Sequence, residues 1–137
     1  MDKYLIDTNI IIYYLEDKIP EFALNKLERI LLESFNVSTI NRIELLGWTS
    51  ITESEKVQLE DFLQAATVFY VDIDIEKKAI DIRQKHTIKT PDALIAATAL
   101  VHDFTLVTRN EKDFQHIEGL LIYNPFHETN PTSSAAS

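Results

Sequence analysis

Four acidic residues occur in local sequences that give each of them a reason to converge with the others. They are Asp7, Glu44, Asp92 and Asp113. Three of them stand where a strand is expected to end or a helix to begin. In an α/β sheet these positions gather along one edge, and a cluster of carboxylates there is what a hard divalent cation requires. The pattern predicts a metal-dependent reaction on a phosphate group.

Asp7 and Glu44 each have a structural role that competes with metal binding. Asp7 can cap the helix that follows it, although Thr8 and Asn9 could take the same role. Glu44 lies three residues after Asn41, and an Asn-x-x-Glu spacing resembles a capping box. The residues alone leave both alternatives open.

Asp92 and Asp113 have similar alternatives. Asp92 lies in the first turn of a helix expected to be capped by Thr90, where the macrodipole stabilises a negative charge by about 0.3–1 kcal/mol. That helix is rich in alanine and almost wholly apolar, which favours a start at the sheet edge rather than in open solvent. Asp113 could line a pocket with Thr108 and Asn110, or Asn110 could cap the turn and leave Asp113 exposed.

The elements that must position these residues alternate between short apolar strands and longer periodic helices. Strands are expected at 3–6, 36–38, 68–71, 104–108 and 120–123, and helices at 10–15, 21–35, 41–48, 52–63, 74–86, 90–100 and 111–114. This alternation predicts parallel pairing through right-handed crossovers, so the fold class is α/β with a parallel sheet covered on both faces. We expect one domain at 1–124 and a flexible C-terminal tail at 125–137.

The composition excludes several kinds of chemistry. The chain has 137 residues, of which 45% are hydrophobic, as expected of one globular domain. The absence of cysteine excludes disulfides, zinc–thiolate sites and thiol catalysis, and the four histidines lack the spacing of a metal site. With no signal-like segment and no apolar run of about 20 residues, we expect a cytoplasmic protein without a membrane span.

The charge is distributed unevenly along the chain. The net charge of −9 is unusual for a nucleic-acid binder as a whole. Residues 77–112, however, hold seven of the 13 Lys and Arg residues and only four of the 22 acids, which leaves +3 in this segment and −12 elsewhere. A basic region beside two of the four acids is compatible with binding a polyanion, and equally with a solvated helical face.

At these motifs the chain resembles the PIN-domain family, and within it the VapC-type toxin ribonucleases of bacterial toxin–antitoxin pairs. The resemblance extends over about residues 3–123, and its segments follow the order of the family: 5–9 (LIDTN), 38–40 (STI) with 44–45 (EL), 90–99 (TPDALIAATA), and 106–110 (LVTRN) with 113–114 (DF).

The resemblance implies a three-layer α/β/α sandwich and an Mg²⁺- or Mn²⁺-dependent endoribonuclease that hydrolyses RNA. It also implies a homodimer and an antitoxin that covers or disrupts the site. By position, Asp7 and Asp92 correspond to the principal metal ligands and Glu44 and Asp113 to the third and fourth acids. The polar residues that support them are Thr8, Asn9, Thr108 and Asn110. Whether the site holds one ion or two stays open.

Two other functions compete with this interpretation. A non-catalytic PIN-like module that binds RNA or protein would be expected to lack one or more of the acids, and all four are present. A phosphatase of the haloacid-dehalogenase type also starts from an aspartate after the first strand, but it needs a second acid where Asn9 stands. In any of these cases, the apolar residues at 10–15 and the face formed by Phe22, Leu27 and Leu31 could serve a protein partner or the core.

Overall fold

The computed structural model describes residues 3–127 and has a parallel β-sheet at its centre. Its strands run in the order β3-β2-β1-β4-β5, and every neighbouring pair is parallel. The bounds are β1 Tyr4–Ile6, β2 Asn36–Ser38, β3 Thr67–Phe69, β4 Thr105–Val107 and β5 Ile122–Tyr123. The strand β1 lies in the middle, with Leu5 opposite Leu106 of β4 and Asn36 of β2. The predicted α/β class with a parallel sheet is confirmed.

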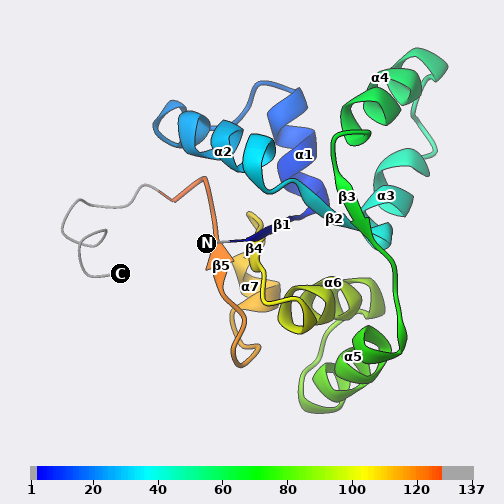
Figure 1. Cartoon of the computed structure of the whole chain (residues 1–137), viewed down its shortest axis with the longest axis vertical. Helices are drawn as coiled ribbons and strands as arrows, with labels where there is room; N and C mark the ends of the chain where they lie inside the picture. The colour runs from blue at the N-terminus through cyan, green and yellow to red at the C-terminus, as the bar shows by residue number, and fades with distance from the viewer. Residues whose placement is uncertain (1–2, 128–137) are drawn as a thin grey trace.

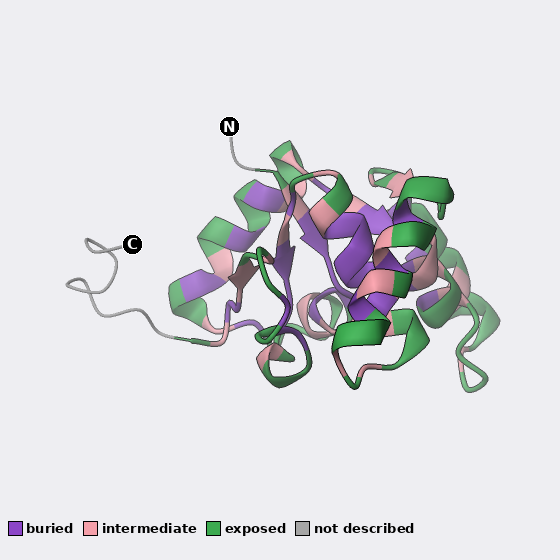
Figure 2. Cartoon of the chain, turned by 90° about the horizontal axis from the view of Figure 1, so that it is seen from below, coloured by how far each residue is buried: buried purple, intermediate pink, exposed green. Residues whose placement is uncertain are grey.

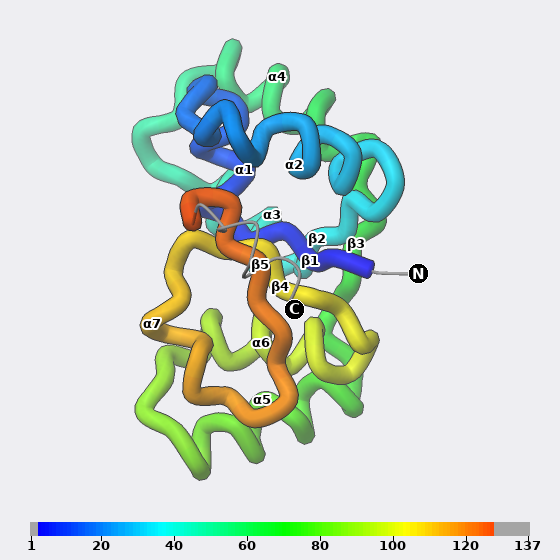
Figure 3. The backbone as a smooth tube through the Cα atoms, turned by 90° about the vertical axis from the view of Figure 1, so that its left-hand side faces the viewer, coloured from blue at the N-terminus to red at the C-terminus, as the bar shows by residue number. Residues whose placement is uncertain are grey.

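Helices cover both faces of the sheet, which makes the predicted three-layer α/β/α sandwich (Figure 1). Their bounds are α1 Thr8–Leu15, α2 Glu21–Glu33, α3 Thr39–Leu46, α4 Glu53–Leu63, α5 Ile73–Lys85, α6 Thr90–Val101 and α7 Glu111–Phe114. One face carries α1, α2 and α4, and the other carries α5, α6 and α7 (Figure 3). The helix α3 starts at the carboxyl end of β2 and contacts both layers.

Each face of the sheet has its own hydrophobic core, because successive side chains of a strand point to opposite faces. Leu5 packs in the core under α5 and α6, whereas its neighbour Ile6 packs in the core under α1 and α2. Leu106 and Val107 of β4 divide in the same way. Figure 2 shows the buried residues at the centre and the exposed residues on the outer sides of the helices. This alternation fixes the register of the central strands.

The predicted elements are present, but α1 and α3 each begin two residues earlier than expected, and α6 has a different N-cap. The helix α3 starts at Thr39 rather than at residue 41, because Ser38 caps it. The helix α6 starts at Thr90 with Lys89 at the N-cap position, so Thr90 is not the cap that the sequence suggested. The strand β2 has the predicted bounds, β1 and β5 begin later than expected, β3 ends earlier, and β4 is shorter at both ends.

The segment after β5 returns to the domain. Asn124 and Pro125 are buried, and the ring of Phe126 meets the ring of Tyr13 of α1 edge-on at 5.0 Å. Phe126 therefore packs against the first helix, and the remainder of the predicted tail, 128–137, lies outside the described residues. Within 3–127, no helix combines the length and apolar character needed to cross a bilayer.

Candidate active site

The site lies at the carboxyl edge of the sheet, where the strands end and the helices begin. Asp7 directly follows β1, Ser38 ends β2, and Thr108 directly follows β4. The helix α6 leads back into β4, so its first turn, with Asp92, lies at the same edge. The topology of the parallel sheet thus brings segments that are distant in sequence to one place.

Asp7 is the buried centre of this site, with only 6% of its surface exposed. Its Oδ1 accepts hydrogen bonds from the backbone N–H of Thr8 at 2.8 Å and from Nδ2 of Asn41 at 3.3 Å. Its Oδ2 accepts one from the hydroxyl of Thr108 at 2.8 Å. Asp7 is therefore the N-cap of α1, a role that the sequence left open between Asp7, Thr8 and Asn9.

The pKa of Asp7 is raised from 3.8 to about 6. Burial is the main cause, and the charges of Glu44 and Asp92 act in the same direction. The hydrogen bonds from Thr108 and Thr8 lower the pKa and limit the rise. The free carboxylate is thus held in a place where its negative charge is unfavourable, and a cation beside it would remove that penalty.

Asn41 connects α3 to this carboxylate, a role that sequence reasoning missed. It is completely buried, its Oδ1 accepts from the N–H of Ser38 at 2.8 Å, and its Nδ2 donates to Thr8 Oγ1 at 2.9 Å as well as to Asp7. Ser38 and Asn41 form the capping box of α3. The signal was present as the Ser-x-x-Asn spacing, but Asn41 was interpreted as the cap itself.

The corrected start of α3 also changes the interpretation of Glu44. This residue lies in the second turn of the helix, three residues beyond Asn41, so it is not the capping glutamate that the Asn-x-x-Glu spacing suggested. Its exposed carboxylate accepts a hydrogen bond from the hydroxyl of Thr8 at 2.7 Å. Thr8 thus links Glu44 to Asn41 and, through it, to Asp7.

Thr108 is the second buried connection. Besides donating to Asp7, its Oγ1 accepts from the backbone N–H of Asn110 at 3.0 Å and from Nδ2 of Asn9 at 3.4 Å. The Oδ1 of Asn9 in turn accepts from the N–H of Arg109 at 3.3 Å. Through Asn9 and Thr108, these contacts join the start of α1 to the loop after β4.

Asp92 and Asp113 lie on the α6 side of the edge. Asp92 is partly buried, and its pKa is raised by this burial first and then by the charges of Asp113 and Glu44. Asp113 is exposed and accepts a hydrogen bond from Nδ2 of Asn110 at 2.6 Å. Asn110 occupies the N-cap position of α7 without bonding through its side chain to the helix backbone, so it supports Asp113 instead of the cap that was considered.

The four acids are close enough to affect one another electrostatically, but their carboxylates do not converge on a single point. Glu44 raises the pKa of both Asp7 and Asp92, and Asp113 raises that of Asp92. Among residues 3–127, no three His, Asp or Glu side chains lie together as a ready-made metal cage. The donors are nevertheless all oxygens, and their mutual repulsion is what a hard divalent cation with several waters would relieve. The donor set therefore fits Mg²⁺ or Mn²⁺.

A second feature of this edge is the side chain of Arg109. Its guanidinium lies over the ring of Phe126, 4.1 Å from the centroid, and over that of Tyr13 at 5.0 Å. The carbonyl of Arg109 accepts a hydrogen bond from Asn124 at 3.4 Å. The segment after β5 thus holds the loop that carries Thr108.

The chain is similar in sequence and in fold to several known proteins. The model of the PIN domain family matches residues 4–120. "Ribonuclease VapC2" of Rickettsia felis is 30% identical, over 88% of this chain and 96% of the relative. The structure of VapBC2 from Rickettsia felis bound to a DNA fragment from its promoter superimposes with a TM-score of 0.75 and 27% identity, over 88% of this chain and 97% of that one. A toxin–antitoxin complex from Klebsiella pneumoniae gives 0.74 and 28%, over 92% and 100%.

Proposed function

The chain belongs to the PIN-domain family, and from this premise we propose that it is a VapC-type endoribonuclease, the toxin of a toxin–antitoxin pair, that hydrolyses RNA with a divalent metal ion. The observation that supports the proposal most directly is the buried carboxylate of Asp7 at the carboxyl edge of the sheet, whose pKa is raised by burial first and then by the charges of Glu44 and Asp92. The ribonuclease name of the Rickettsia relative indicates the reaction class.

In the proposed reaction, Asp7 and Asp92 would hold the metal ion, with Glu44 and Asp113 as further acids of the site. A bound Mg²⁺ or Mn²⁺ ion would supply Lewis-acid polarisation of the phosphoryl group. The protein's own part is to fix the donors. Thr108 and Asn41 hold the two oxygens of Asp7 in place, and Thr8 positions Glu44.

RNA cleavage in Mg²⁺ or Mn²⁺ tests the proposal. We expect Asp7→Asn and Asp92→Asn to lose activity, and EDTA to abolish it in the unaltered protein. Asp61→Asn is the matched control, because it removes an equal charge from an exposed position of α4, on the layer opposite α6. Equal cleavage by the unaltered protein and both active-site variants would refute the proposed site.

A non-catalytic binding module is the second candidate, and one observation favours it: no three acids within 3–127 converge as a cage. Calorimetric titration with Mn²⁺ separates the two functions. Binding that is lost in Asp7→Asn supports the enzyme. Absence of binding at millimolar Mn²⁺, together with RNA binding without cleavage, would favour the module.

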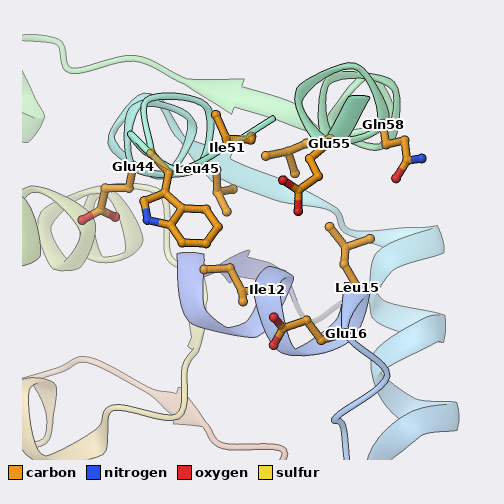
Figure 4. A pocket seen from close by; sticks show the side chains of 10 residues that line it. Ile12, Leu15, Glu16, Glu44, Leu45, Ile51, Glu55 and Gln58 are labelled. Atoms are coloured by element: carbon orange, nitrogen blue, oxygen red, sulfur yellow. The ribbon is translucent and has the colours of Figure 1, made fainter. Parts of the chain in front are cut away.

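We propose further that the antitoxin occupies an apolar groove of about 490 Å³ between α1, α3 and α4. Ile12 and Leu15 line one side of it, and Leu45 and Ile51 line the other (Figure 4). Trp48 also lines the groove and has 60% of its surface exposed. The two similar solved structures are a toxin–antitoxin complex and a VapBC2 complex, which supports a protein partner here.

The charges of the groove indicate what kind of segment would bind. Glu16, Glu44 and Glu55 all line it, so the complementary segment would combine apolar side chains with Arg or Lys. Glu44 belongs both to the groove and to the candidate active site, and Figure 4 shows it at one end of the groove. A bound segment would therefore lie beside an acid of the reaction, which provides a route to inhibition. We propose also that the protein forms a homodimer and acts in the cytoplasm.

A further inference from the structure

A second, polar pocket lies directly beside the candidate active site. It has a volume of about 550 Å³ and is bordered by Asp92 and Asp113. Its other wall is formed by the end of α5 and the connection to α6, which contribute Arg83, His86 and Lys89. One proposed metal ligand, Asp92, and a further acid of the site, Asp113, thus share a pocket with the cationic side chains of Arg83 and Lys89.

A backbone carbonyl in the connection between α5 and α6 holds the side chain of Arg83. Its Nε donates a hydrogen bond to the carbonyl of Ile88 at 3.2 Å. This contact uses one donor of the guanidinium and leaves the four N–H groups of its two terminal nitrogens for a ligand. A planar guanidinium fixed in this way is suited to the oxygens of a phosphate.

The two cations of the pocket differ from their neighbours on α5 in their ion pairs. Lys78 and Lys85 both pair with Asp81, at 3.9 and 3.2 Å. Within 3–127, no ion pair is formed by Arg83 or by Lys89. Neither charge is therefore held in a direct ion pair, although the charge of Lys89 lowers the pKa of Asp92 from across the pocket. Lys89 is also the residue just before α6, three positions from Asp92.

The cations of this pocket would offset the repulsion between the acidic site and the phosphates of an RNA substrate. A chain with a net charge of −9 and four acids at its site repels a polyanion, and local cations are needed to bring phosphates next to those acids. The pocket supplies them at the place where they are needed, within the segment 77–112 that has a net charge of +3.

We propose that Arg83 and Lys89 form a subsite for the RNA phosphate next to the one that is cleaved. This inference rests on the proposed ribonuclease function and deepens it by assigning the side of the site along which the RNA strand runs. Neither residue needs to take part in the chemical step. They are positioning residues, and their removal affects binding of the strand rather than the reaction of bound RNA.

Steady-state cleavage of a labelled single-stranded RNA oligonucleotide, at several salt concentrations, tests the subsite. We expect Arg83→Gln and Lys89→Gln each to raise KM about five- to tenfold with kcat changed less than about twofold. Each lost phosphate contact also reduces the slope of log affinity against log salt by about 0.7 for a single strand. The matched control is Lys77→Gln, an equal charge change at an exposed position of α5 that does not line the pocket, and its KM and slope are expected to stay unchanged.

Binding without cleavage separates failure of this inference from failure of the proposed function. Fluorescence anisotropy measures RNA affinity in an Asp7→Asn background, with and without the two substitutions, and thermal melting verifies that each variant is folded. Unchanged affinity and salt slope in the Arg83→Gln/Lys89→Gln double variant would overturn the subsite even if RNA is cleaved. An equal loss in Lys77→Gln, or a loss confined to kcat, would overturn it too. If the unaltered protein cleaves no RNA but the double variant binds it more weakly, the subsite stands and the ribonuclease proposal falls.

Discussion

The substitution Asp7→Asn is expected to make the metal-free protein more stable at neutral pH. The pKa of Asp7 is about 6 in the folded protein and 3.8 in its ordinary state. Between these values the folded protein holds a proton that the unfolded chain releases, so the free energy of unfolding falls as the pH rises from about 4 to about 6 and is level above that. A difference of about two pKa units corresponds to roughly 3 kcal/mol.

An amide of the same shape carries no charge and removes this pH-dependent penalty. Urea denaturation in EDTA should therefore show Asp7→Asn gaining up to about 3 kcal/mol over the unaltered protein between pH 4 and pH 7. Any constant offset from altered hydrogen bonds appears equally at both ends of this range. Because the carboxylate is buried beside other acids, Mg²⁺ should stabilise the unaltered protein at pH 7 and have less effect on the variant.

The difference in the free energy of unfolding between Asp7→Asn and the unaltered protein must change with pH if burial raises the pKa of Asp7. A difference between the two proteins that is the same at pH 4, 5, 6, 7 and 8 would show that burial does not raise the pKa of Asp7. A difference that grows in favour of the unaltered protein as the pH rises would reverse the sign and refute the electrostatic account of the site. Direct titration of the carboxyl group by NMR is an independent check.

Three further predictions follow from single contacts. Thr108→Val removes a charge-assisted hydrogen bond from the carboxylate of Asp7, so we expect a loss of about 1.5–3 kcal/mol at pH 8 that shrinks as the pH falls through about 6, where Asp7 is protonated, measured by urea denaturation. Asn41→Ala removes the buried amide that joins the start of α3 to Asp7; we expect about 1–3 kcal/mol lower stability and a lower kcat in RNA cleavage, and unchanged kcat would refute its positioning role. Trp48→Ala should leave RNA cleavage intact but weaken neutralisation by a co-expressed antitoxin, whereas Leu32→Ala, at an exposed position outside the groove, should affect neither.

The alternation of elements was predictable because it depends on local patterns. Short apolar runs and amphipathic segments identified every strand and helix, and parallel topology then placed Asp7 and Asp92 at the same edge of the sheet. The N-caps of α3 and α6 were less predictable, because several polar residues in a row could cap each helix. Ser38 caps α3 through its side chain, whereas Lys89 occupies the N-cap position of α6 without a side-chain hydrogen bond.

The role of Asn41 could not be recognised from its neighbours in sequence. Its amide is placed by the capping box of α3, but it acts on Thr8 and Asp7, which are more than 30 positions away. The same holds for Thr108 and Asp7, which are 101 positions apart and meet only because β1 and β4 are adjacent in the sheet.

The sequence by itself determined the fold class, the oxygen-only donor set and the edge of the sheet at which the acids gather, because periodicity and residue type are local properties. The tertiary structure decided which of the acids is buried and which partners surround it. Burial is the sum of contacts from distant segments, and it is burial that raises the pKa of Asp7 while Glu44 and Asp113 stay exposed. The placement of Arg83 and Lys89 beside Asp92 also depends on the packing of α5 against α6, which no local pattern specifies.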